Sequence, residues 1–340
     1  MKDRKAAVIG GGAWGLALAK VLVENGNPVC VWEYNPQYVK ILNETHTNPD
    51  LLSGIILPEA IRFTNQFSDL CVYAPEIIIL AIPSQFIRST LSGLSQETHN
   101  ALFCRNDIYA IINVAKGVEL KSGKLIHQLL NELLPCELPL FTLSGPSHAE
   151  EVARQLPTTV VIAGSEQAKL GELQRLFSNA YFRVYSSTDI TGVEIGGAVK
   201  NIIAIASGIL AGLGLGDNTN GALLSRGIVE IQRLGMALGA KAETFLGLSG
   251  IGDLITTATS PHSRNRFVGF EIGKGRKASD ILASMKMVAE GVASTKAVYE
   301  LSHRIGIEMP IVDQIYAILY QDKDPKAALN SLMQRELKPE

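Results

Sequence analysis

Lys200 is the residue of this sequence that stands out most clearly as a candidate for chemistry. It lies in the segment 194–201 (EIGGAVKN), which continues into the apolar residues 202–206. The segment predicts a helix that is apolar on nearly all sides and therefore buried. An unpaired ammonium is costly to bury, so Lys200 either reaches solvent along its alkyl chain or is kept for a task. Gly196 and Gly197 lie on the same helix face, where they leave room for a small ligand.

Two other stretches in the second half of the chain carry polar groups that could contact a ligand. Segment 247–254 places the carboxylate of Asp253 in an apolar, glycine-rich turn, and segment 260–266 (SPHSRNR) combines Ser263, Arg264 and Asn265 at a predicted helix start. Arginine offers a planar fork for phosphate, and the backbone N–H groups of a helix start add further donors. The alternative for the second segment is a capped helix with solvated arginines.

The first chemical signal along the chain is a glycine-rich turn between a strand and a helix. A predicted strand at residues 6–9 leads directly into the segment 10–15 (GGGAWG), which opens a predicted helix, and a second strand follows that helix. Gly10 permits a tight turn, Gly12 lets the backbone approach a pyrophosphate, and Gly15 permits close packing of the helix. The helix N-terminus adds free N–H groups and the positive end of its dipole. This unit predicts a dinucleotide site, with a ligand-free glycine turn as the alternative.

The end of the second strand carries information about which dinucleotide binds. An acidic residue there commonly holds the ribose 2′-hydroxyl of NAD, whereas an arginine accepts the 2′-phosphate of NADP. Residues 32–36 (WEYNP) contain Glu33 and Tyr34 but no cation before Lys40. Glu33 therefore indicates NAD, and an ordinary surface glutamate is the alternative.

Alternating strands and helices continue through the first half of the chain. Strands are predicted at residues 76–82, 108–114, 138–143, 158–163 and 182–185, with helices at 86–94 and 166–177. Ligands bind beyond the carboxyl ends of the strands in an open parallel sheet, and Lys116 and the turn 144–147 follow such ends. Pro146 suits the first turn of a helix that could bind an anion. His148 lacks a carboxylate or serine partner at a recognisable spacing, so we interpret it as a helix-start residue.

After Thr188 the strand pattern stops, and alanine, leucine and glycine dominate. Helices are predicted at residues 223–238, 277–285, 294–305, 312–320 and 325–332, whereas residues 288–291 predict only a turn. The change of class occurs without a flexible linker. We therefore expect an α/β dinucleotide-binding domain at residues 1–188 and an all-α domain at residues 189–340.

Length and composition limit the classes of function that remain open. A chain of 340 residues, 46% hydrophobic and 19% charged, is typical of a folded protein with two domains. The net charge of −2 gives no reason to expect nucleic acid or an anionic membrane as a partner. The four cysteines are far apart in sequence, so neither a metal site nor a disulfide scaffold is predicted. The N-terminus leaves no space for a signal peptide, and no apolar run reaches membrane-spanning length uninterrupted. We expect a cytoplasmic protein without stable membrane insertion.

Taken together, these residues closely resemble the NAD(P)-dependent glycerol-3-phosphate dehydrogenases of the bacterial type, from the first strand to about Tyr320. The resemblance rests on seven segments in the same order: Gly10–Gly15 with Trp14, 113–117 (NVAKG), 144–151 (SGPSHAEE), 194–201, 247–253, 263–266 (SRNR) and Glu290-Gly291. It implies a Rossmann-like N-terminal domain and a C-terminal helical substrate and catalytic domain, with the active site between them. It also implies reversible conversion of dihydroxyacetone phosphate and glycerol 3-phosphate, which supplies the glycerol backbone of phospholipids.

The resemblance extends to individual site residues. Lys200 matches the acid–base residue, with Lys116 and Asp253 beside it. The positions expected to hold the phosphorylated substrate are Lys116, Gly145, Ser147, Lys200, Asp253, Ser263, Arg264 and Asn265. The positions expected to hold NAD(H) or NADP(H) are Gly10, Gly12, Ala13, Trp14, Gly15, Glu33, Tyr34, Pro83, Lys116, Ala149, Arg264, Val288 and Glu290. No metal is expected, and a homodimer is compatible with the sequence.

The sequence departs from this family near the expected adenosine end of the cofactor. The family usually has Arg or His where Tyr34 stands, Glu33 replaces a residue that is often Gly, and Leu51 takes the place of a Tyr. Two rival functions stay open on the residues alone. A related two-domain reductase would act on a hydroxy acid, whose carboxylate replaces the phosphate. A dinucleotide sensor without turnover would have no reason to keep Lys116, Lys200 and Asp253 together.

Overall fold

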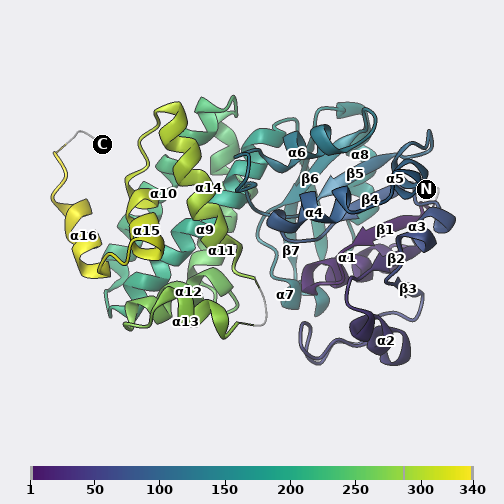
Figure 1. Cartoon of the computed structure of the whole chain (residues 1–340), viewed down its shortest axis with the longest axis horizontal. Coiled ribbons are helices and arrows are strands. Elements are labelled where there is room, and N and C mark those ends of the chain that lie inside the picture. Colours follow the sequence, from purple (N-terminus) through teal and green to yellow (C-terminus); the bar gives the residue numbers. More distant parts are fainter. Residues whose placement is uncertain (1–2, 286–287, 338–340) are drawn as a thin grey trace. The chain divides into compact units, whose positions relative to one another are not determined.

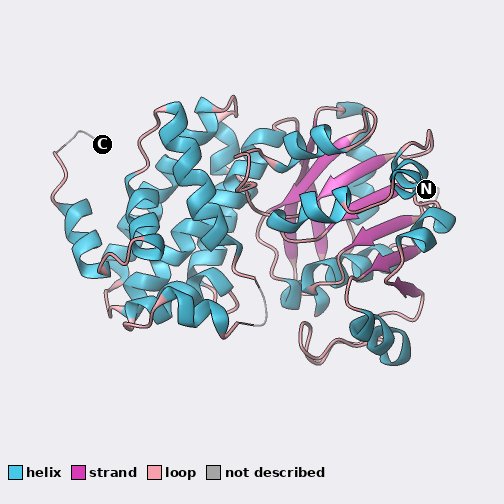
Figure 2. Cartoon of the chain, in the orientation of Figure 1, coloured by secondary structure: helices cyan, strands magenta, loops and turns pink. Residues whose placement is uncertain are grey.

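The structure is a computed structural model that describes residues 3–285 and 288–337. The chain forms two compact units, one comprising Met1–Ala115 and Ile126–Ile190, the other Lys116–Leu125 and Thr191–Glu340. Figure 2 shows strands in the first unit and only helices in the second. The short segment Lys116–Leu125 therefore packs with the second unit although the chain on both sides of it belongs to the first. The expectation that the N-terminus leaves no space for a signal peptide concerns a segment that starts with Met1 and Lys2. These two residues lie outside the described residues.

A single mixed sheet forms the centre of the first unit (Figure 1). Its strands, within the described residues, are β1 (Ala6–Ile9), β2 (Val29–Trp32), β3 (Ile61–Thr64), β4 (Ile77–Leu80), β5 (Ala110–Asn113), β6 (Leu140–Ser144), β7 (Thr158–Gly164) and β8 (Phe182–Ser187). They lie in the order β3-β2-β1-β4-β5-β6-β7-β8. Neighbours pair in parallel except β6 and β7, which are antiparallel. The sheet confirms the α/β class predicted for this half of the chain.

Helices cover both faces of this sheet, which explains why its central strands β1 and β4 are apolar and buried along their whole length. Ala6 and Val8 of β1 pack in one core, and Ala7 and Ile9 pack in the other. The first core includes α1 (Ala13–Glu24), α2 (Pro36–Thr45), α7 (Ala149–Ala153) and α8 (Gln167–Phe177). The second includes α3 (Phe67–Tyr73), α4 (Ile87–Ser92), α5 (Gln96–Phe103) and α6 (Ile126–Leu133), with the short turn η1 (Ser84–Phe86) before α4.

The second unit is built around the long helix α9 (Ile190–Gly212), most of which is buried. Around it lie α10 (Asp217–Ala237), η2 (Ala242–Leu246), η3 (Leu248–Gly252), α11 (Asp253–Thr259), α12 (Arg264–Gly273), α13 (Ala278–Ala283), α14 (Glu290–Ile305), α15 (Pro310–Tyr320) and α16 (Pro325–Met333). This confirms the predicted all-α class. One prediction is wrong in detail: Glu290 and Gly291 are the first residues of α14 and not part of a turn, because the helix extends four residues further toward the N-terminus than the predicted start at residue 294.

Glycines bring helices α9 and α12 into close contact. A Cβ atom on Gly208 would lie 2.1 Å from the backbone oxygen of Arg266, and one on Gly269 would lie 1.9 Å from that of Ile205. No side chain fits at either position, so the two backbones approach directly. This packing fixes α12 against the C-terminal half of α9, on the C-terminal side of Lys200 and Asn201.

Helix α9 has 23 residues, and Gly197, Lys200 and Asn201 are among the residues that interrupt its apolar sequence, as expected. It is long and apolar enough to cross a membrane, but 89% of its most apolar window is buried within the protein. Other helices of the second unit, together with Val118 and Leu125 of the segment Lys116–Leu125, supply the surrounding core. Helix α9 is therefore the core helix of this unit.

Candidate active site

The glycine-rich turn has the geometry of a phosphate-binding loop. Gly10 adopts a φ of 119°, and a Cβ there would lie 2.6 Å from the backbone oxygen of Ala81. A Cβ on Gly15 would lie 2.0 Å from the backbone oxygen of Gly10, so the helix packs directly on the turn. Gly12 instead faces open space, with no atom within 4 Å of its added Cβ, and it forms the N-cap of α1 without a side-chain cap. The backbone at Gly12 and the first turn of α1 therefore fit a pyrophosphate.

Trp14 supplies a second observation that fits a ligand at this turn. Its indole N–H is buried and finds no acceptor among the described residues. The ring is partly exposed on α1 and lies 6.4 Å from that of Phe182 between centroids. A buried donor without a partner is costly, and a bound ligand would satisfy it. Ala13 begins α1 beside it, whereas Pro83 and Ala149 follow the ends of β4 and β6 at the starts of η1 and α7.

Glu33 is tied to the glycine-rich turn and is not an ordinary surface glutamate. Its side chain is 5% exposed, and burial raises its pKa above the usual value despite the hydrogen bonds that it accepts. Oε2 accepts the N–H of Gly11 at 3.0 Å, and Oε1 accepts that of Asn35 at 2.9 Å. An ionised carboxylate has further lone pairs for a ribose hydroxyl but nothing to donate to a phosphate. Tyr34, the next residue, is 74% exposed.

The turn after β6 presents Gly145 and Ser147, two residues predicted to hold substrate. Gly145 has a φ of 132°, a conformation that favours glycine, and its added Cβ would lie 3.1 Å from Cα of Val160. The hydroxyl of Ser147 donates to the backbone oxygen of Gly145 at 2.8 Å, which fixes the turn. His148 is the N-cap of α7, as predicted. Pro146, in contrast, lies outside that helix, because α7 begins only at Ala149; the prediction that it opens the helix is wrong.

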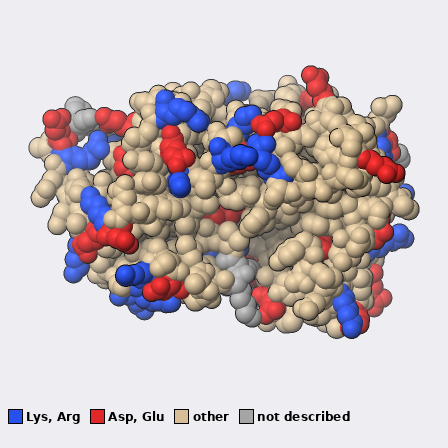
Figure 3. Space-filling view, viewed as in Figure 1, with Lys and Arg blue, Asp and Glu red and all other residues tan. Residues whose placement is uncertain are grey.

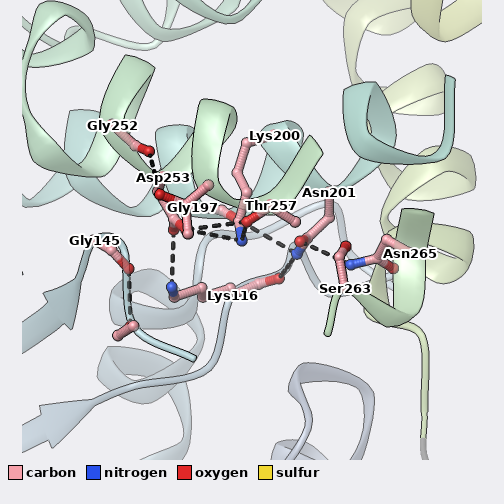
Figure 4. Close-up of polar contacts among 12 residues, drawn as sticks. Lys116, Gly145, Gly197, Lys200, Asn201, Gly252, Asp253, Thr257, Ser263 and Asn265 are labelled. Atoms are coloured by element: carbon pink, nitrogen blue, oxygen red, sulfur yellow. Dashed lines mark hydrogen bonds and ion pairs between the residues drawn. The ribbon is translucent and has the colours of Figure 1, made fainter. Parts of the chain in front are cut away.

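In the second unit, two lysines share one buried carboxylate. Nζ of Lys200 lies 3.1 Å from Oδ1 of Asp253, and Nζ of Lys116 lies 2.8 Å from Oδ2 (Figure 4). Asp253 is 1% exposed and Lys200 5%. Lys200 therefore does not reach solvent along its alkyl chain: its ammonium is held inside the protein by a counter-ion.

Thr257 completes the contacts of the Lys200 ammonium and was not identified from the sequence. Its hydroxyl accepts a hydrogen bond from Nζ of Lys200 at 2.6 Å and donates one to Oδ1 of Asp253 at 3.2 Å. Asp253 opens α11, and Thr257 follows four residues later on the same face of that helix. In the sequence, only its position four residues after Asp253 in the predicted all-α domain could have indicated Thr257.

The pKa values of Lys200 and Asp253 are both shifted from their usual values. Burial lowers the pKa of Lys200 to about 8, because the desolvation penalty and the Lys116 ammonium outweigh the opposing effect of Asp253. Burial alone would raise the pKa of Asp253, but the ammonium groups of Lys116 and Lys200 reverse that effect and lower it. At neutral pH the cluster therefore contains one carboxylate and two ammonium groups, of which Lys200 is poised to release its proton.

The backbone of Lys116 is held in place by a buried amide chain. Asn201 donates to the backbone oxygen of Lys116 at 3.1 Å and accepts from the side chain of Asn265 at 2.8 Å. Asn265 in turn accepts the N–H of Gly291 at 2.9 Å, and Glu290 accepts the N–H of Lys116 at 3.2 Å. Helices α9, α12 and α14 thus jointly position Lys116. Asn201 was not among the predicted site residues.

At the start of α12, some polar side chains make contacts within the protein and others are exposed to solvent. Ser263 is the N-cap, and its hydroxyl accepts the N–H of Arg266 at 3.2 Å. Ser263 and Asn265 are buried, whereas Arg264 is exposed and donates from Nη1 to the backbone oxygen of Val288 at 3.0 Å. Among these three, the Arg264 guanidinium is the group most accessible to a phosphate, since its remaining N–H groups stay available.

The room expected beside Gly196 is not free. A Cβ on Gly196 would lie 2.4 Å from the backbone oxygen of Ser249, so the glycine permits η3 to pack against α9 and does not form a ligand space. This contact places η3, and with it the following Asp253, next to Lys200. The prediction of a ligand space at this glycine is therefore wrong, but the glycine still serves the site.

Charges of both signs are interspersed on the face seen in Figure 3. The candidate site residues belong to two groups: the glycine-rich turn, Glu33 and the turn 144–147 in the first unit, and the residues around Lys200 in the second. A phosphate-binding loop on a Rossmann-like sheet, combined with a buried lysine of lowered pKa, is the arrangement of a dinucleotide-dependent oxidoreductase.

Comparison with known proteins narrows this class to one family. The model of the NAD-dependent glycerol-3-phosphate dehydrogenase N-terminus matches residues 5–170, and that of its C-terminus matches residues 189–330. A glycerol-3-phosphate dehydrogenase (NAD(P)+) of Pelodictyon phaeoclathratiforme is 44% identical over 338 residues, covering 98% of each chain. The crystal structure of glycerol-3-phosphate dehydrogenase from Coxiella burnetii has a TM-score of 0.91 at 34% identity, covering 98% of this chain and 99% of that one. The chain belongs to the NAD-dependent glycerol-3-phosphate dehydrogenase family.

A more distant similarity concerns the fold alone. The structure of D-mandelate dehydrogenase with NADH and anilino(oxo)acetate has a TM-score of 0.61 at 12% identity, covering 96% of this chain and 99% of that one. A hydroxy-acid reductase can therefore share this plan of two units, and the fold by itself does not distinguish the substrates.

Proposed function

We propose that this protein interconverts dihydroxyacetone phosphate and sn-glycerol 3-phosphate, with NAD(H) or NADP(H) as the redox partner. The observation that carries the proposal is the Lys200 ammonium, buried and held by Asp253 and Thr257. Family membership supports the substrate, and the accessible guanidinium of Arg264 supports a phosphate in it. The product supplies the glycerol backbone of phospholipids.

Residues of the first unit would hold the dinucleotide. The glycine-rich turn and the first turn of α1 would bind the pyrophosphate, Trp14 would donate its unsatisfied indole N–H, and Glu33 would accept a ribose hydroxyl. When bound, the nicotinamide supplies or accepts the hydride at the substrate carbon. Catalysis requires that a substrate held by the second unit meet this cofactor, as the family resemblance implies.

Residues of the second unit would stabilise the negative charge on the substrate oxygen and transfer a proton to or from it. As the ketone is reduced, its oxygen gains negative charge, and a preorganised ammonium stabilises that charge where water is excluded. Lys200 would then donate its proton, which its lowered pKa favours, and would accept it back in the oxidation direction. Asp253 and Thr257 orient the ammonium, while Lys116 lowers its pKa and adds a second cation near the oxygen.

An assay of NAD(P)H oxidation with three candidate substrates tests this function. We expect rapid oxidation with dihydroxyacetone phosphate and very slow oxidation with unphosphorylated dihydroxyacetone and with a branched 2-keto acid. Fast turnover of the keto acid would establish the hydroxy-acid reductase instead, and tight binding of NAD(P)H without turnover of any substrate would establish the sensor.

The remaining properties are proposals of the same kind. We infer a cytoplasmic enzyme that acts on a small phosphorylated molecule and does not need nucleic acid or membrane insertion. The net charge of −2 supports this, because it gives neither nucleic acid nor an anionic membrane a general electrostatic attraction. Light scattering during size-exclusion chromatography would distinguish a homodimer from a monomer.

A further inference from the structure

Two cysteines that are far apart in sequence meet on the surface of the first unit. Cys104 is the C-cap of α5, and Cys136 lies between α6 and β6. Both are free and exposed. The thiol of Cys136 donates to the backbone oxygen of Phe103 at 3.5 Å, and the thiol of Cys104 donates to Oδ1 of Asn100 at 3.7 Å. Since Phe103 directly precedes Cys104, these contacts bring the two thiols to the same end of α5.

The two thiols also contact each other. Burial raises the pKa of the Cys136 thiol, and the neighbouring Cys104, to which it is hydrogen-bonded, raises it further. The other two cysteines differ: Cys30 is buried, and Cys71 donates to the backbone oxygen of Thr98 at 3.8 Å. No group of three His, Cys, Asp or Glu side chains in the described residues could hold a metal ion, so the pair is not part of such a cluster.

We infer that Cys104 and Cys136 form a dithiol site that a small-molecule disulfide oxidises to an intramolecular disulfide. In the first step, one cysteine thiolate attacks a sulfur of the reagent, forms a mixed disulfide and releases one reagent thiol. In the second step, the other cysteine thiolate attacks the mixed disulfide at the protein sulfur and expels the second reagent thiol. The two cysteines lose two electrons, the reagent gains them, and the two thiol protons leave with the reagent thiols.

The proposed disulfide does not rest on the proposed dehydrogenase function. The loop that it would close nevertheless contains Lys116, a residue of the candidate active site. Residues 105–135 lie between the two cysteines and include β5, the segment Lys116–Leu125 and α6. A disulfide would tie the end of α5 to the chain that follows α6 and would restrict the unfolded state of this long loop. In a reducing compartment the bond would form only during exposure to an oxidant and would be reversed by thiols.

The site can be tested on the full native chain with oxidised glutathione as the probe. After incubation, remaining thiols are blocked with N-ethylmaleimide, and peptides are mapped by mass spectrometry. We expect one linked peptide pair, Cys104 to Cys136, lighter than the two free peptides by two hydrogens. The link should be lost in Cys104→Ser and in Cys136→Ser, unchanged in the matched control Cys71→Ser, and removed by dithiothreitol. Its rate of formation should rise with pH, because the thiolate is the attacking species.

Three results would overturn the inference. Glutathione adducts on Cys104 and Cys136 without a link would show that the thiols cannot reach each other. A link that forms only in denaturant would show that it belongs to the unfolded chain. A link between two copies of the chain, visible as a covalent dimer, would show that the exposed thiols react between molecules. Circular dichroism of both serine variants confirms that loss of the link is not loss of folding.

Discussion

Lys116 and Lys200 bind different oxygens of the same carboxylate, that of Asp253, at 2.8 and 3.1 Å. Two positive charges therefore share one negative charge in a site that is almost closed to solvent. This imbalance favours an additional anion, and the oxygen of a ketone being reduced becomes one. Burial lowers the pKa of Lys200 against the opposing effect of Asp253, and Lys116 adds to the lowering because it disfavours the charged form.

Replacing Lys200 by methionine should lower kcat by roughly 10²-fold or more, as expected for loss of proton transfer. Methionine has a similar length and no charge, so it fits the buried helix while leaving Asp253 paired with Lys116. The measurement is steady-state kinetics with dihydroxyacetone phosphate, together with cofactor affinity from fluorescence, which should change little. The exposed Lys326→Met serves as the control. A kcat for Lys200→Met close to that of the control would remove Lys200 from the mechanism.

The pH dependence of the reaction should reflect the pKa of about 8 at Lys200. Reduction of the ketone needs the protonated lysine, so its kcat/KM should fall as pH rises above about 8. Oxidation of glycerol 3-phosphate needs the neutral lysine, so its kcat/KM should rise over the same range. Profiles in both directions that bend in the same sense would contradict this assignment.

Substitutions of the two charged neighbours should move this pKa in opposite directions. Lys116→Met removes a cation that lowers it, so the bend in the profile should move to higher pH. Asp253→Asn removes the anion that raises it, so the bend should move to lower pH. The residual activity of each variant across pH is the measurement. Shifts in the same direction would show that the bend belongs to another group.

Replacing Thr257 by valine should lower kcat by about tenfold with little change in KM, because the hydroxyl orients the Lys200 ammonium by a bond of 2.6 Å. A hydrogen bond to a charged group contributes about 1.5–3 kcal/mol, which allows an effect of this size. Thr257→Ser retains the hydroxyl and should recover most of kcat. If serine and valine variants are equally slow, the methyl packing of Thr257 matters and its hydroxyl does not.

Replacing Arg264 by alanine should raise the KM for dihydroxyacetone phosphate by about 10- to 100-fold, because a charged contact to the phosphate is lost. The cofactor KM should change much less. Arg276→Ala is the matched control, since Arg276 is also exposed but pairs with Glu271 at the far end of α12. Equal effects on both KM values, or an equal effect of the control, would show that Arg264 does not select the phosphate.

Cofactor preference should lie toward NADH, or show at most a weak preference for NADPH. Glu33 offers acceptors only and Tyr34 is exposed, so residues 32–36 (WEYNP) provide no cation for a 2′-phosphate. The ratio of kcat/KM for the two cofactors is the measurement. Tyr34→Arg should shift that ratio toward NADPH. A native preference for NADPH above about tenfold, or about 1.4 kcal/mol, would refute the prediction.

Much of the first unit could be predicted because its signals are local. The glycine-rich turn and the continuous apolar strands need no knowledge of distant contacts. Strand β3 was missed because Arg62 interrupts its short apolar run, and the pairing of Ile61 with Val29 in β2 provides its stability instead. The antiparallel pairing of β7 with β6 likewise depends on the path of the chain and not on the composition of either strand.

The candidate site was predictable where a charge stood alone in an apolar segment, as Lys200 and Asp253 do. Thr257 was not, because a threonine in a helix has many ordinary explanations and its partner lies on another helix. The pairing of Asn201 with Asn265 depends on the close contact between α9 and α12, which is a tertiary property. The meeting of Cys104 and Cys136 is tertiary for the same reason.

The segment Lys116–Leu125 has a consequence for how the two units could be separated. A cut near residue 190 would leave Val118 and Leu125 attached to the first unit without the core in which they are buried. The second unit, starting after that cut, would lack Lys116 and would leave Asp253 with one of its two cations. Neither fragment would therefore be a self-sufficient module. A gene fusion at this boundary that exchanges the helical units of two dehydrogenases would therefore not be enough. It would also have to exchange the ten-residue segment Lys116–Leu125, which is encoded within the sequence of the first unit.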